Sequence, residues 1–221
     1  MKIPLIILAL TFFIQNLNSQ LAVIKDPDGF TNVRQEPNGN SKIIYKLLES
    51  EIFSYFEGNS KNGWIEVSIS KNKFDLYCYE SGNYLIGYIH ESRFKPIENL
   101  PKYKGNNFTF QYDLQKFYAG DKIIEKEGNW VKKINGRSFY GTDGGLPTTE
   151  INGINILIDG QKIEVSSALY EDLYECNNNF NVNKIGKDFI ISQWNSDGAG
   201  GFIIAWVLNK DGIKQRSIWI P

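Results

Sequence analysis

The stretch "NGWIEVSI", residues 62–69, decides the fold class of the N-terminal half of this chain. Asn62 and Gly63 tolerate the positive φ angles of a tight turn, and the residues that follow them are typical of a β-strand. Because side chains alternate between the two faces of a strand, Trp64 shares a face with the charged Glu66. We therefore expect the Trp64 indole to be partly buried, with one edge exposed.

Similar short runs lie on both sides of this stretch and predict a compact all-β barrel. A further hairpin is expected around residues 80–83, with arms at 74–79 and 84–89. The pairs Asn38-Gly39 and Gly58-Asn59 have the composition of turns between strands. The other strands are expected at residues 21–24, 43–48 and 52–56.

Several motifs occur together in this half of the chain: Asp28-Gly29 before Asn32-Val33-Arg34, Pro37, Ser41-Lys42-Ile43-Ile44, Gly63-Trp64-Ile65-Glu66-Val67 and Gly87-Tyr88-Ile89-His90. In this combination, residues 21–94 resemble the bacterial SH3 domain, SH3b. The resemblance implies an SH3-like barrel with a groove for a peptide or glycan. It also implies that Phe30, Trp64 and Tyr88 line the groove and that Arg34 meets a ligand carboxylate there.

The stretch from Ser68 to Leu85 is longer than this family usually has between its last two barrel strands. It either covers the groove or leaves it open.

The acidic turn Asp26-Pro27-Asp28-Gly29 has two interpretations, a metal-binding loop or an entrance to the barrel. Nothing downstream supplies carboxylates at the alternate spacing of an EF-hand loop. Pro27 fixes φ, Gly29 supplies flexibility, and Asp side chains can bind the local backbone. The turn is favoured, and we expect no metal and no cofactor.

Residues 95–106 carry two prolines, a glycine and charges without periodicity, and are expected to be a linker. Residues 107–221 predict an α+β domain with an antiparallel sheet and one helix at 168–174, capped by Ser166 or Ser167. Asp159-Gly160 is expected to turn a hairpin. The strands are expected at residues 108–112, 122–125, 130–134, 154–158, 162–165, 189–194, 202–208 and 213–220.

Two glycine-rich loops, residues 141–147 and 195–201, are the most suggestive part of this domain. A strand is expected on each side of the second loop, which favours a wide hairpin over a phosphate cradle that opens onto a helix. If both loops lie at one end of the sheet, Asp143, Asn195 and Asp197 converge on a shared ligand or cation. The two loops resemble those of secreted proteins of the Bacteroidetes, a resemblance that implies no particular activity.

Catalytic groups are few. His90 is the single histidine, and a Cys78–His90 pair would lie on strands of the binding module rather than in a catalytic domain. Neighbouring carboxylates, Glu125 with Glu127 and Glu171 with Asp172, do not face each other across a cleft as a glycosidase pair does, and they are expected on solvated faces. Cys78 and Cys176 either form a disulfide or remain buried thiols.

Residues 1–19 read as a signal peptide, because their apolar run is shorter than a bilayer span and Ser19 offers a small residue for cleavage. We expect a secreted or periplasmic protein with no membrane anchor after cleavage. The chain has 24 Lys and Arg against 25 Asp and Glu, interleaved throughout, which argues against nucleic acid as a partner.

The sequence thus predicts a non-enzymatic protein that binds peptidoglycan peptide or a secreted or periplasmic protein. The alternatives are an inhibitor or immunity-type protein that blocks a secreted enzyme, and a cell-wall hydrolase with an unrecognised site.

Overall fold

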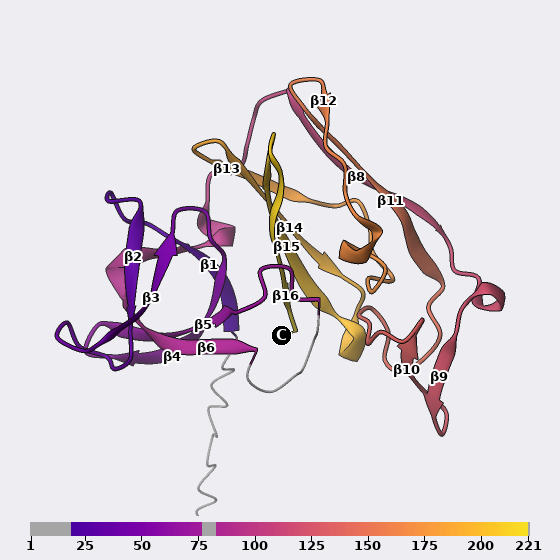
Figure 1. Cartoon of the computed structure of the whole chain (residues 1–221), viewed down its shortest axis with the longest axis horizontal. Coiled ribbons are helices and arrows are strands. Elements are labelled where there is room, and N and C mark those ends of the chain that lie inside the picture. The colour runs from indigo at the N-terminus through magenta and orange to yellow at the C-terminus, as the bar shows by residue number, and fades with distance from the viewer. Residues whose placement is uncertain (1–18, 77–82, 221) are drawn as a thin grey trace, which may run out of the picture.

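The computed structural model describes residues 19–76 and 83–220, and it is a mainly β structure of antiparallel sheets (Figure 1). The helical elements in these residues are 3-10 turns of three residues each. None of the helical segments in the described ranges has the length and apolar character that a membrane crossing requires.

The N-terminal half forms one seven-stranded sheet with the order β3-β2-β6-β5-β4-β1-β7. No pairing joins the edge strands β3 and β7 in the described residues, so the predicted closed barrel is not formed. β7 spans only three residues and ends at Pro96, which has no N–H to donate to a further strand. The strands are β1 (Ser19–Ile24), β2 (Phe30–Arg34), β3 (Ile43–Leu48), β4 (Phe53–Lys61), β5 (Trp64–Ser70), β6 (Tyr84–His90) and β7 (Phe94–Pro96).

Strand β5 shows the alternation that the sequence predicts. Ile65 and Val67 are buried in the core of the first sheet, whereas Trp64 and Glu66 are half-buried on the opposite face. The expected mixed position of Trp64 is confirmed. β6 crosses β2 so closely at Gly87 that a Cβ there would lie 2.5 Å from a methyl carbon of Val33, which explains the glycine.

The C-terminal half contains two larger sheets and a hairpin, with the main core between the sheets. The four-stranded sheet lies between the N-terminal sheet and the β12-β11-β8 sheet (Figure 1). Its strands are β13 (Asn181–Ile185), β14 (Asp188–Asn195), β15 (Phe202–Asn209) and β16 (Gly212–Trp219). The outer sheet consists of β8 (Phe108–Lys116), β11 (Thr149–Ile158) and β12 (Gln161–Lys162), and the hairpin of β9 (Ile124–Glu127) and β10 (Trp130–Ile134).

The predicted helix at 168–174 is wrong. The segment contains only the 3-10 turn Ser167–Leu169, and its second part is held by backbone bridges from Leu173 to Tyr140 and from Tyr174 to Glu150. So short a segment gains little from helix formation in isolation, and the bridges fix it in a non-helical conformation. The α+β assignment is therefore corrected to an arrangement of β-sheets.

An apolar interface joins the two halves. Leu21, Val23 and Ile52 pack against Ile190 and Val207 of the four-stranded sheet. Residues of the expected linker take part in this contact, because Ile97 is buried in the same cluster.

Hydrogen bonds reinforce this interface. The backbone of Ile52 exchanges two of them with the Gln215 amide, at 2.8 and 2.7 Å, and Ser50 Oγ donates to Asp188 Oδ2 at 2.6 Å. The two halves are therefore packed together rather than joined only by a tether.

The first residues of the long connection between β5 and β6 contact the C-terminal half. Lys73 O accepts a hydrogen bond from the Arg216 N–H at 2.8 Å, and Asp75 Oδ2 accepts one from the Ile218 N–H at 3.1 Å. β5 pairs directly with β6 from Trp64 to Ser70, and residues 74–76 are not in a strand. Residues 77–79 of the strand expected there, with Cys78, lie outside the described residues.

Candidate functional site

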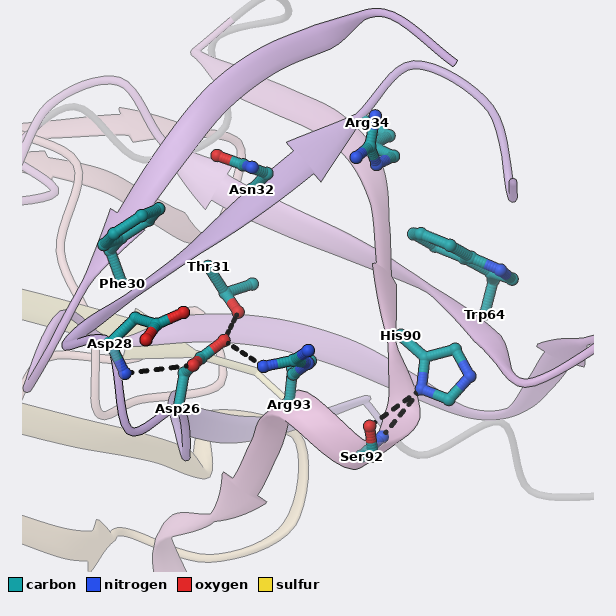
Figure 2. Close-up of a pocket in the computed structure, with 10 residues that line it drawn as sticks. All are labelled: Asp26, Asp28, Phe30, Thr31, Asn32, Arg34, Trp64, His90, Ser92 and Arg93. Carbon is teal, nitrogen blue, oxygen red and sulfur yellow. Dashed lines mark hydrogen bonds and ion pairs between the residues drawn. The ribbon is translucent and has the colours of Figure 1, made fainter. Parts of the chain in front are cut away.

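An open pocket of about 520 Å³ lies on the N-terminal half, where β2 faces the ends of β5 and β6 (Figure 2). Three of the four residues predicted for the groove line it, namely Phe30, Arg34 and Trp64. The other lining residues are Asp26, Asp28, Thr31, Asn32, His90, Ser92 and Arg93.

Strand β2 supplies one wall of the pocket. Phe30 and Arg34 lie on the same face of the strand because their positions differ by an even number of residues. Arg34 Nη1 donates to Ser41 O at 2.7 Å, and no carboxylate within the described residues lies in ion-pair distance of this guanidinium. Lys46 Nζ lies 3.4 Å from the centre of the Phe30 ring. The wall thus combines an aromatic ring with a guanidinium that has no anionic partner there.

The turn at Asp26 fixes the floor of the pocket. Asp26 Oδ2 accepts hydrogen bonds from Thr31 Oγ1 and Arg93 Nη1, both at 2.8 Å, and Asp26 Oδ1 accepts one from the Asp28 N–H at 3.2 Å. The hydrogen bond from Thr31 is the main cause that lowers the pKa of Asp26. Gly29 has a φ of 73°, which favours glycine. The Asp26 carboxylate therefore holds a turn, as predicted.

The described part of the chain contains no group of three or more His, Cys, Asp or Glu side chains placed to hold a metal ion.

Trp64 and His90 form the opposite wall. They are paired residues of β5 and β6, and their rings meet edge to face at 5.7 Å. His90 Nδ1 accepts the Ser92 N–H at 3.3 Å and lies 2.9 Å from Ser92 Oγ, so the imidazole caps the 3-10 turn Glu91–Arg93. Gly63 has a φ of 78°, and a Cβ there would lie 3.0 Å from His90 Nε2. The turn thus leaves room for the imidazole.

His90 and Ser92 are residue types that can act as a base and a nucleophile, but their contacts here are those of a turn cap. A hydrolytic nucleophile requires a base that a third group orients. Here the Nδ1 lone pair faces the backbone N–H of the same turn, an arrangement that serves as a cap. The alternative Cys78–His90 pair includes a residue outside the described ranges and stays a prediction.

Tyr88, the fourth predicted groove residue, lies beside the pocket rather than in its wall. It is the register partner of both Arg34 and Glu66. Its hydroxyl donates to Glu66 Oε2 at 3.1 Å, and this hydrogen bond is the main cause that raises the pKa of Tyr88. The Tyr88 side chain therefore connects β6 to β5 on the outer face of the sheet.

The second predicted cluster is brought together only in part. The two glycine-rich loops touch, since Ser196 Oγ donates to Gly141 O at 2.8 Å. Asp143 and Asp197 are exposed, but Asn195 is fully buried, and its Oδ1 accepts the Asn177 N–H at 3.3 Å. Asn195 supports the loop from inside and is not available to a ligand. The loop at 195–201 joins β14 to β15, as the hairpin interpretation predicts.

The predicted carboxylate pairs differ in their environment. Glu125 and Glu127 are exposed, as expected. Asp172 is only 3% exposed, so its predicted place on a solvated face is wrong. Its Oδ2 accepts a hydrogen bond from Nη2 of the fully buried Arg216 at 2.7 Å. Burial raises the pKa of Asp172, and the Arg216 charge opposes that rise.

Sequence reasoning missed Arg216 as the partner of Asp172 because the two residues are 44 positions apart. Cys176 is also buried, which raises the pKa of its thiol. The disulfide with Cys78 stays a prediction, since Cys78 is outside the described residues.

Comparison with models of known protein families, with curated proteins and with solved structures finds no match.

Proposed function

We propose that this chain is a non-enzymatic binding protein, secreted or periplasmic, whose SH3-like N-terminal half recognises a short peptide. The favoured ligand is the stem peptide of peptidoglycan, and a segment of a protein partner is the other form of the same proposal. The observation that carries it is the pocket that Phe30, Arg34 and Trp64 line together, in which no carboxylate of the described residues lies in ion-pair distance of the Arg34 guanidinium. No metal or cofactor is part of this proposal.

The chemistry of the pocket suits a peptide that carries a carboxylate. Its volume of about 520 Å³ falls within the range of small-ligand sites, which is roughly 300–1,000 Å³. Arg34 offers the planar donor geometry that pairs with a carboxylate, and the two aromatic rings offer apolar contact to a side chain. Asp26 is already held by Thr31 and Arg93, so the floor need not rearrange on binding.

The described part of the β5–β6 connection lies away from the groove. Its residues Lys73 and Asp75 contact β16 of the C-terminal half, and none of its described residues, 71–76 and 83, lines the pocket. The apolar stretch at residues 3–14 supports export from the cytoplasm. An exported protein would have access to the cell wall.

Retention of the purified chain, residues 20–221, on isolated cell-wall sacculi tests this proposal. We expect the wild type to sediment with sacculi and Arg34→Gln to remain largely in the supernatant. Asp143→Asn is a matched control, because it removes an exposed charge from the other half. Equal sedimentation of Arg34→Gln and wild type would contradict the assignment of the groove, and no sedimentation of the wild type would contradict wall binding.

One observation favours the inhibitor or immunity-type alternative. The two glycine-rich loops meet at one end of the C-terminal half, with Asp143 and Asp197 exposed on them. Such an end could enter the active site of a secreted enzyme. Co-purification from the native periplasm with mass spectrometry discriminates the two readings. A stoichiometric enzyme partner that Asp143→Asn with Asp197→Asn releases would favour inhibition over wall binding.

A further inference from the structure

A second, polar pocket of about 170 Å³ lies in the C-terminal half. It is formed by five separate segments of the chain, which come together only in the folded protein. The groups that line it are predominantly amides, hydroxyls and paired charges. The main ones belong to Gln115, Lys122, Glu150, Asn152, Tyr170 and Glu171.

An ion pair forms one side of this pocket. Glu150 is only 8% exposed, and its Oε2 lies 3.1 Å from Lys122 Nζ. The other carboxylate oxygen, Oε1, accepts a hydrogen bond from Gln115 Nε2 at 2.9 Å. The partners hold the carboxylate in one orientation, since each of its oxygens is bound. An oxygen of this kind can accept an additional hydrogen bond from a ligand hydroxyl.

A β-bulge shapes the second side. The register of β8 and β11 shifts between Ile151 and Gly153, so Asn152 is the extra residue. Bulges redirect side chains and carbonyls next to functional sites. The Asn152 carbonyl faces the Tyr170 hydroxyl at 3.5 Å, a distance too long for a strong hydrogen bond. The Tyr170 hydroxyl is therefore only weakly held and can serve a ligand.

The third side is aromatic. Tyr174 is 3% exposed, and its ring is fixed by edge contacts with Phe117 and Phe139, at 5.6 and 5.5 Å between centroids. Burial, with Glu150 as the next cause, raises the pKa of Tyr174. Ser167 adds an exposed hydroxyl at the rim.

The charges of the pocket determine the class of ligand. Lys122 is paired with Glu150, and Glu171 lies 3.7 Å from Arg137. A charged ligand would have to compete with one of these pairs, whereas ligand hydroxyls can both donate to carboxylates and accept from amides. We propose that this pocket binds one neutral sugar ring through its hydroxyl groups. The proposal is independent of the peptide groove, which lies in the other half of the chain.

Titration of the isotopically labelled chain, residues 20–221, with methyl glucoside and with N-acetylglucosamine tests the proposal by NMR. We expect saturable shifts of the amides around the pocket with at least one of these probes. Tyr170→Phe should weaken binding about threefold to tenfold, the loss of one hydrogen bond. Tyr118→Phe is the matched control, because Tyr118 is 68% exposed and does not line the pocket.

Three results of the titrations of the wild type would overturn the proposal. They are the absence of saturable shifts with both sugars, shifts that map to another surface, and equal binding of a charged probe such as glutamate. If Tyr170→Phe alters the fold, Ser167→Ala replaces it, because Ser167 is exposed at the rim. Binding that neither variant changes would equally contradict the assignment.

Discussion

Replacement of Trp64 by alanine distinguishes a role of this residue in the core from a role in the wall of the groove. Complete loss of a core tryptophan costs about 3–5 kcal/mol. Trp64, however, is half-buried on the face opposite the core and keeps one edge contact with His90 at 5.7 Å. Such a contact contributes about 0.5–1.5 kcal/mol. With partial loss of apolar burial, we expect Trp64→Ala to lower the free energy of unfolding by about 1–2 kcal/mol.

Urea unfolding of the chain, residues 20–221, measures this change. The neighbouring variant Ile65→Ala is the comparison, because Ile65 is 4% exposed in the core and should cost about 2–5 kcal/mol. In thermal unfolding, we expect the melting temperature of Trp64→Ala to lie within about 2–8 °C of the wild-type value. We also expect Trp64→Ala to lose peptide binding. A cost equal to that of Ile65→Ala, or loss of the unfolding transition, would refute the placement of Trp64 in the groove wall.

Three further predictions concern the scaffold. Gly87→Ala should cost about 1–3 kcal/mol in urea unfolding, because its Cβ would meet Val33 at 2.5 Å; a neutral result would contradict the close crossing of β6 and β2. Asp172→Asn should cost about 3–5 kcal/mol by the same assay, since it leaves Arg216 buried without its anion; a cost below 1 kcal/mol would exclude that ion pair. Burial tends to raise the pKa of Asp188, but hydrogen bonds from Lys214, Ser50 and Asn209 lower it below the ordinary 3.8. The ionised Asp188 carboxylate therefore stabilises the fold above about pH 3.8, and this stabilisation is lost as the pH falls further. Asp188→Asn should make the free energy of unfolding less dependent on pH in this acid range.

The sequence predicts those parts of the fold that depend on local patterns. The alternation of β5 and the positive φ angles of Asp159 and Gly160, 50° and 78°, are local properties and appear as expected. Strands β2 and β13 were not predicted, because FTNVR and NVNKI each contain asparagine, which is depleted in strands. Their pairing partners stabilise them.

Two of the errors share one cause, which is contact between residues far apart in the sequence. The segment at 168–174 resembles a short helix, but backbone bridges to Tyr140 and Glu150 decide its conformation. The expected linker contributes Ile97 to the interface between the halves, which composition alone does not show.

The same distinction applies to the candidate site. Phe30, Arg34 and Trp64 were expected together because the resemblance to SH3b implies that they lie near the loops that flank a groove, and all three line the pocket. Asn195 could not be assigned, because only the folded chain shows that it points into the interior toward Asn177. The pocket around Glu150 gave no signal in the sequence, since its five segments are widely separated.

Two tryptophan indoles provide the most direct test of the proposed peptide groove. The Trp64 indole lines the groove, whereas Trp206 is fully buried and donates its Nε1–H to the Tyr112 hydroxyl at 3.0 Å. NMR spectra of the chain, residues 20–221, should be recorded during titration with a synthetic peptidoglycan stem peptide, with the Trp64 indole peak assigned through Trp64→Phe. The account predicts a saturable shift of the Trp64 peak and an unchanged Trp206 peak. A Trp64 peak that does not move at saturating peptide would contradict it.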